Sequence, residues 1–131
     1  MIDHVNAYAL TVRDVRGCAE FYRDKLGLKL QEMSDDFAYL TFDRKGPGLA
    51  LVSAQGLAKE IPSDRVRPGE SLTQRNYLAV FLEDADRAYE ELRAKGVRFV
   101  QSPTTRPNGQ RFAFFEDPEG NLWEISHFPK E

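Results

Sequence analysis

Phe112 to Phe128 reads FAFFEDPEGNLWEISHF and is the most informative stretch of the chain. It holds two runs rich in aromatic and β-branched residues, which are typical of strands. Between them lies Asp117-Pro118-Glu119-Gly120-Asn121, where proline presets φ for a turn and glycine or asparagine tolerates a positive φ. The stretch therefore predicts two strands joined by a tight connection. The second strand carries one acid, Glu124, and a buried carboxylate is costly unless it is paired, hydrogen-bonded or functional.

The composition is that of one globular domain. The 131 residues can bury a core, and 41% hydrophobic with 30% charged residues is an ordinary balance. The formal net charge is −3, and no block of Lys or Arg indicates a nucleic-acid or membrane partner. The N-terminus MIDHVNAYALTV lacks a signal-peptide layout, and the single cysteine, Cys18, cannot form an internal disulfide. We therefore expect a cytoplasmic protein that binds neither nucleic acid nor membrane.

The first half of the chain follows a strand–helix–strand order. Residues 5–12 alternate in a way that favours a strand with two different faces. Asp14 is a good N-cap for a helix that ends near Leu26, and Gly27 follows as a left-handed cap. Three short strands are then expected, at residues 28–33, 37–42 and 49–53.

The same order returns about seventy residues later. A strand over residues 77–82 precedes Asp84, a second N-cap, and Gly96 ends the helix that follows. A further strand begins at residues 97–100, and a loop at residues 103–110 leads to the two strands of the opening stretch. The sequence thus predicts a single domain over residues 1–131. It consists of two βαβββ modules, at about residues 1–55 and 74–131, with a linker at about residues 56–73.

Two segments, FYRDKLGL at residues 21–28 and DPEGNLWE at residues 117–124, give this layout a specific resemblance. Over nearly its whole length the chain resembles the vicinal oxygen chelate superfamily. That superfamily includes glyoxalase I, bleomycin-resistance proteins, fosfomycin-resistance enzymes, methylmalonyl-CoA epimerase and extradiol dioxygenases. The resemblance implies an α+β fold in which two βαβββ modules form curved mixed sheets around a cavity, commonly in a homodimer.

The resemblance also implies where a metal site would lie, because metal-using members take ligands from the first and fourth strands of each half. Where a His or Gln is usual in the first strand, this chain has Ala7, and at the usual His position of the second half it has Tyr77. The fourth strand of the first half, at residues 49–52, offers no ligand, and only Glu124 matches. One carboxylate does not hold a transition metal, which needs three or four ligands. We therefore expect no metal and no cofactor.

The family's inward positions, combined with strand alternation, predict an apolar and aromatic pocket that contains one acid. Each aromatic residue taken singly is better explained by core packing, but small alanines opposite large aromatic residues leave a space when the set is taken together. Glu124 is expected either to orient a ligand or to be neutralised by Arg111 or the Tyr77 hydroxyl. The loop before Phe112 could place Arg106 or Arg111 at the pocket mouth. The ligand-binding residues predicted in this way are Ala7, Ala9, Thr11, Tyr77, Phe81, Arg111, Phe112, Phe114, Leu122 and Glu124.

Two kinds of function fit these residues. The first is a metal-independent binding protein of the bleomycin-resistance type, which sequesters an aromatic or cationic organic compound, as in antibiotic resistance, by stacking and cation–π contact. The alternative is a lyase, isomerase or dioxygenase-type enzyme that uses Glu124 as general acid or base, or an unusual metal site. A ligand sensor has no specific support in the sequence. Because the usual metal ligands are missing, the sequence favours binding over catalysis.

Overall fold

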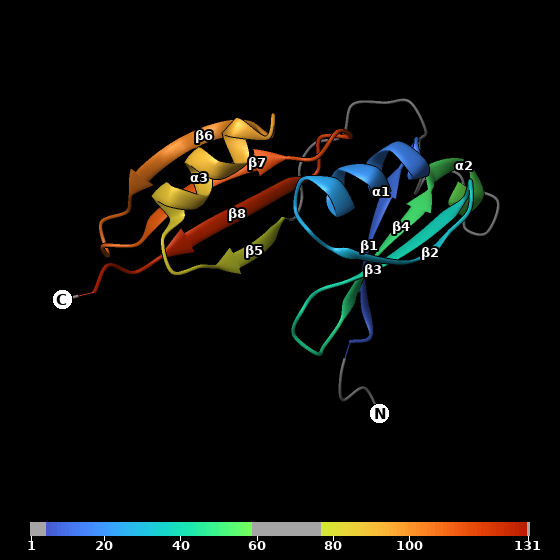
Figure 1. The fold of residues 1–131 in the computed structure, drawn as a ribbon, viewed down its shortest axis with the longest axis horizontal. Coiled ribbons are helices and arrows are strands. Elements are labelled where there is room, and N and C mark those ends of the chain that lie inside the picture. The colour runs from blue at the N-terminus through green and yellow to red at the C-terminus, as the bar shows by residue number, and fades with distance from the viewer. Residues whose placement is uncertain (1–4, 59–76, 131) are drawn as a thin grey trace. The chain divides into compact units, whose positions relative to one another are not determined.

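The structure is a computed structural model that describes residues 5–58 and 77–130. The chain forms two compact units, at residues 1–72 and 73–131, and each holds one four-stranded mixed sheet with a helix on one face (Figure 1). The strand order is β1-β4-β3-β2 in unit 1 and β5-β8-β7-β6 in unit 2. The predicted α+β class with two βαβββ modules is confirmed.

Unit 1 begins with β1 (Ala7–Val12) and α1 (Val15–Asp24) and continues with β2 (Lys29–Met33), β3 (Phe37–Thr41), β4 (Gly48–Ser53) and the short helix α2 (Ala54–Ala58). Strand β1 pairs in parallel with β4, whereas β4, β3 and β2 pair antiparallel. Helix α2 lies where the sequence predicted the end of module 1 and the start of the linker. The rest of the predicted linker falls at residues 59–76, outside the described residues.

Local sequence sets both ends of α1. The Asp14 carboxylate accepts a hydrogen bond from the Gly17 backbone N–H at 3.0 Å, and Gly27 after the helix has a φ of 80°. The helix packs on β2, β3 and β4. Its buried side chains are Val15, Cys18, Ala19, Phe21 and Tyr22.

The sheet of unit 1 has two different faces, as the alternation in residues 5–12 predicted. Leu10 of β1 is in register with Leu51 of β4, which is fully buried on the side of α1. The alternate residues Ala7, Ala9 and Thr11 therefore lie on the opposite face of this sheet.

Unit 2 comprises β5 (Leu78–Phe81), α3 (Ala85–Ala94), β6 (Arg98–Thr105), β7 (Arg111–Glu116) and β8 (Leu122–His127). The Asp84 carboxylate caps α3 by accepting from the Arg87 N–H at 3.1 Å, and Gly96 has a φ of 88°. Strand β6 extends to Thr105, so the loop predicted from residue 103 begins three residues later. The pairing of β6 with β7 is irregular between residues 99 and 104, and a bulged strand of this kind accommodates Pro103.

The turn between β7 and β8 forms as the opening stretch predicts. The buried Asp117 carboxylate accepts hydrogen bonds from the backbone N–H groups of Glu119 (2.8 Å) and Asn121 (2.9 Å). Gly120 has a φ of 84°, which an L side chain rarely adopts. One aspartate therefore organises the whole connection. No helix within residues 5–58 and 77–130 is long and apolar enough to cross a membrane, and the cytoplasmic location stays a prediction.

Candidate functional site

The candidate site lies on the face of the unit 2 sheet opposite α3, called the Glu124 face below. Helix α3 packs on β6, β7 and β8, and the buried Trp123 and Ile125 of β8 lie on its side of the sheet. Strand register then places every second residue on the other side. The residues of the Glu124 face are Ala79 and Phe81 of β5, Phe112, Phe114 and Glu116 of β7, and Leu122, Glu124 and Ser126 of β8.

A chain of polar side chains adjoins Glu124. Glu124 is only 4% exposed, and its Oε2 accepts a hydrogen bond from Arg106 Nη2 at 2.8 Å. Arg106 Nη1 donates to Gln110 Oε1 at 2.8 Å, and Gln110 Nε2 donates to Ser126 Oγ at 3.1 Å. The acid is therefore buried as one half of an ion pair, and Gln110 connects this pair to the hydroxyl of Ser126.

The β6–β7 connection, Arg106-Pro107-Asn108-Gly109-Gln110, positions these polar side chains. Arg106 N donates to Gln110 O, and Gly109 N donates to Arg106 O, both at 2.9 Å. The Asn108 side chain accepts from the Gln110 N–H at 3.0 Å, and Gly109 has a φ of 90°. Proline, asparagine and glycine each suit a tight hairpin connection. The turn thus brings the Arg106 and Gln110 side chains together at the end of the sheet.

An aromatic row adjoins the ion pair. The Arg106 guanidinium carbon lies 3.9 Å from the centroid of the Phe112 ring, which is cation–π geometry. Phe112 meets Phe114 edge to face at 5.9 Å, and Phe114 meets Tyr77 in the same way at 5.2 Å. Tyr77 is 51% exposed and Phe81 is 74% exposed. The row is therefore an accessible apolar surface with a charged group at one end.

Most of the predicted ligand-binding residues are brought together in this way. Six of them belong to unit 2 and lie on or beside the Glu124 face: Tyr77, Phe81, Phe112, Phe114, Leu122 and Glu124. Three more of the predicted residues, Ala7, Ala9 and Thr11, belong to β1 and share the face of the unit 1 sheet opposite α1. Their sharing one site with Glu124 stays a prediction.

Arg111 does not lie on the Glu124 face, which corrects its predicted place in the pocket. It is in register with His127 and points toward α3, where Nε and Nη2 donate to the Asp86 carboxylate at 2.9–3.2 Å. These hydrogen bonds lower the pKa of Asp86 below its ordinary value. The physical reason is alternation: residue 111 precedes Phe112 in the same strand, so the two side chains leave opposite faces. The partner of Glu124 is Arg106.

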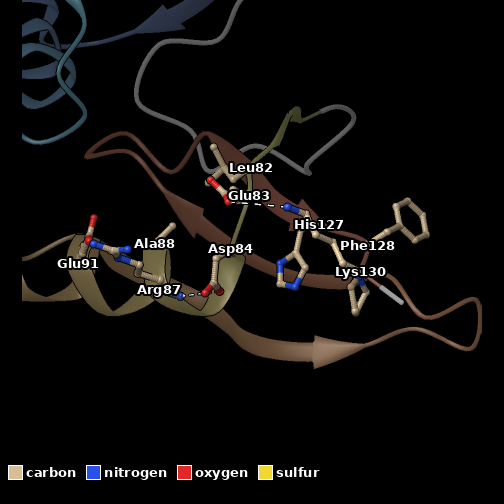
Figure 2. Close-up of a pocket in the computed structure, with 10 residues that line it drawn as sticks. Leu82, Glu83, Asp84, Arg87, Ala88, Glu91, His127, Phe128 and Lys130 are labelled. Atoms are coloured by element: carbon tan, nitrogen blue, oxygen red, sulfur yellow. Dashed lines mark hydrogen bonds and ion pairs between the residues drawn. The ribbon is translucent and has the colours of Figure 1, made fainter.

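A groove of about 580 Å³ runs beside α3, away from the Glu124 face (Figure 2). Near it, the side chains of Asp84, Asp86 and His127 converge so that one ligand atom of each lies within 4.8 Å of the others. Each already has a structural role, because Asp84 caps the helix, Asp86 binds Arg111, and His127 Nδ1 accepts the Ala85 N–H at 2.7 Å. These three residues hold the start of α3 against the sheet.

Within the described part of unit 2, the residues at Glu124 do not fit a divalent metal. Among the described residues, Glu124 belongs to no group of three His, Cys, Asp or Glu side chains with converging ligand atoms. The nearby Tyr77 places its ring against Phe114. A guanidinium already occupies Glu124 Oε2, and a second cation at the same oxygen would meet its charge at short range.

Sequence reasoning named Arg106 only as a residue that could reach the pocket mouth, and it did not select Gln110. Alternation did place Ser126 on the face of Glu124, because the two residues are two positions apart in one strand. One signal could have found Gln110. The tripeptide Pro107-Asn108-Gly109 predicts a tight hairpin, which sets the two flanking side chains beside each other.

The two βαβββ units and the position of Glu124 are typical of one superfamily, and comparison with known proteins gives the same assignment. The chain belongs to the glyoxalase/bleomycin resistance protein/dioxygenase superfamily, whose family model matches residues 1–125. Protein YraH of Bacillus subtilis is 35% identical over 118 residues, which are 88% of this chain and 91% of YraH. Metallothiol transferase FosB of Staphylococcus saprophyticus is 27% identical over 127 residues, 95% of this chain and 77% of FosB.

Solved structures show the same fold. A glyoxalase/bleomycin resistance protein/dioxygenase from Nocardioides superimposes with a TM-score of 0.83 at 30% identity, covering 99% of this chain and 86% of that one. Lactoylglutathione lyase from Agrobacterium tumefaciens superimposes with a TM-score of 0.74 at 19% identity, covering 96% and 94%. The second likeness concerns the fold alone. Superfamily membership, predicted from the sequence, is thereby confirmed.

Proposed function

We propose that this protein is a metal-independent binding protein that holds a planar aromatic compound on the Glu124 face. The observation that carries the proposal is the aromatic row ending on the Arg106–Glu124 ion pair. Small-molecule sites combine apolar walls with few polar groups that fix orientation, and this face has that composition. The rings offer edge and face contacts to a ligand ring, each worth about 0.5–1.5 kcal/mol beyond area burial.

The ion pair changes which ligands are favoured. The sequence predicts an aromatic or cationic ligand on the basis of the aromatic walls together with the Glu124 carboxylate. Glu124 Oε2 is bound by Arg106, and the Glu124 side chain is only 5% exposed, so this carboxylate offers little attraction to an added cation. The structure thus supports the aromatic part of the prediction and removes the carboxylate's support for the cationic part.

Calorimetric titration with a panel of planar aromatic compounds tests the proposal. Phe114→Leu keeps an apolar side chain but removes the ring at the centre of the row, and about a two- to tenfold loss of affinity is expected. Trp123 fluorescence is a poor monitor of this binding, because Trp123 is buried on the α3 side and stacks on Phe115.

Phe99→Leu is the matched control. Phe99 packs edge to face against Tyr89 of α3 at 4.6 Å, so the same substitution acts on the opposite side of the sheet and should leave affinity unchanged. An equal loss from both substitutions, or no saturable binding of any aromatic compound, would contradict the proposal.

The similarity to FosB favours a second candidate, an enzyme that uses Glu124 as acid or base. On this candidate the Arg106 hydrogen bond would have to open before Glu124 Oε2 could take a proton from a substrate. Elemental analysis of the purified protein gives a direct comparison. A stoichiometric transition metal would favour the enzyme and count against metal-independent binding.

We also propose that the chain acts as a homodimer. Strands β1 and β5 lie at the edges of their sheets and expose large apolar side chains, Tyr8 at 46% and Phe81 at 74%. Exposed apolar edge strands favour pairing with another chain. Sedimentation equilibrium should give twice the 15.0 kDa chain mass, and a monomer at all concentrations would overturn this proposal.

A further inference from the structure

The Arg106 guanidinium is held on three sides. The Phe112 ring lies against it at 3.9 Å, and Glu124 and Gln110 each accept one of its N–H groups at 2.8 Å. An isolated arginine side chain samples many rotamers, and ordering it costs conformational entropy. These contacts meet that cost within the folded protein. The cation is therefore fixed before a ligand arrives, as a binding site requires.

Part of the guanidinium is left for a ligand. Of its five N–H groups, residues in the described ranges 5–58 and 77–130 accept two. The Arg106 side chain is 30% exposed, whereas that of Glu124 is 5% exposed, so the positive end of the pair faces solvent and the negative end is covered. The other acid on this face, Glu116, lies 3.3 Å from Arg98 and is paired in turn.

We propose that Arg106 selects the ligand by charge, so that this face binds planar aromatic compounds that carry a carboxylate. The ligand ring packs on Phe114 and Tyr77, and the carboxylate accepts from the outward N–H groups of Arg106. Guanidinium and carboxylate match in planar geometry and charge. This inference rests on the proposed aromatic-binding function and adds the charge of the ligand. A cationic compound would meet Arg106 before the covered Glu124.

Three naphthalene compounds of similar size and different charge test the inference: 2-naphthoate, 2-naphthamide and 2-naphthylmethylammonium. Calorimetry on the wild-type chain near neutral pH should show the naphthoate binding about tenfold more tightly than the amide, or ~1.4 kcal/mol at 25 °C. The ammonium compound should bind least tightly. This comparison needs no variant, so it holds even if a substitution at Arg106 prevents folding.

Variants then locate the preference. Arg106→Gln should bring the naphthoate and amide affinities to within about twofold, and Arg106→Lys should retain part of the preference. Arg111→Gln removes the same charge from the α3 side of the sheet and should leave the preference intact. Equal affinity for naphthoate and amide, or a preference that survives Arg106→Gln, would overturn this inference alone. No binding of any of the three would overturn the proposed function as well.

Discussion

Replacing Arg106 with methionine should destabilise unit 2 strongly, because it leaves the Glu124 carboxylate buried without its partner. Breaking a fully buried ion pair from one side costs about 3–5 kcal/mol. The lower end, about 3 kcal/mol, is expected here, since Arg106 is 30% exposed and water can partly replace it. Glu124→Gln keeps an acceptor for Arg106 and should cost only about 1.5 kcal/mol, the difference between a charged and a neutral hydrogen bond.

The double variant, Arg106→Met with Glu124→Gln, decides whether the two residues act as a pair. Once Arg106 is replaced, Glu124→Gln leaves a buried neutral amide rather than a buried charge. The free energy of unfolding of the double variant should therefore fall by about 2.5 kcal/mol in all. That loss is about 2 kcal/mol less than additivity of the single losses would give. Urea unfolding followed by the fluorescence of Trp123, the single tryptophan and buried in β8, measures each variant in unit 2.

Arg98 and Glu116 provide a matched pair in the same sheet. Their side chains are 83% and 24% exposed and lie 3.3 Å apart, so the same substitutions, Arg98→Met and Glu116→Gln, should couple by at most about 0.5 kcal/mol. Additive losses at Arg106 and Glu124, or coupling no larger than in this control, would refute the buried ion pair.

Three further substitutions test an ion pair, a turn glycine and a helix cap. Asp86→Asn should flatten the acid limb of the curve of unfolding free energy against pH, below about pH 4. In the wild-type chain the Arg111 hydrogen bond lowers the folded-state pKa of Asp86. The stabilisation from this ion pair is therefore present above the ordinary pKa of about 3.9 and is lost as pH falls through the folded-state pKa. Gly109→Ala places a side chain at a φ of 90° and should cost about 1–2 kcal/mol in urea unfolding, with weaker ligand binding through displacement of Arg106. Asp14→Ala removes the cap of α1 and should cost about 1 kcal/mol, measured by thermal unfolding.

Each of these changes has a close control. Glu91→Gln removes an acid from the exposed Arg87–Glu91 pair on α3 and should leave the acid limb almost unchanged, and an identical effect of both variants would contradict the role of Asp86. Gly109→Asn should lower the free energy of unfolding less than Gly109→Ala does, because asparagine tolerates positive φ. Asp14→Asn keeps a capping oxygen, so a loss as large as that of the alanine variant would refute the cap.

The sequence by itself determined the elements and their repeat. Short-range signals were sufficient, because a cap such as Asp14 or Asp84 and a glycine such as Gly27 act within one turn of chain. Strand alternation likewise separated the helix-facing residues from the opposite face in both sheets. The same rule already placed Arg111 away from Phe112, and the prediction that put both in the pocket neglected it.

Only the tertiary structure decided what surrounds Glu124. Alternation says which face a strand residue leaves, but it does not say which loop side chain reaches that face. Arg106 lies 18 residues before Glu124, and the two meet because the β6–β7 hairpin folds back beside β8. This contact depends on strand register and on the hydrogen bonds of the 106–110 turn, neither of which a local pattern fixes. The isolated acid of the sequence is thus one half of an ion pair.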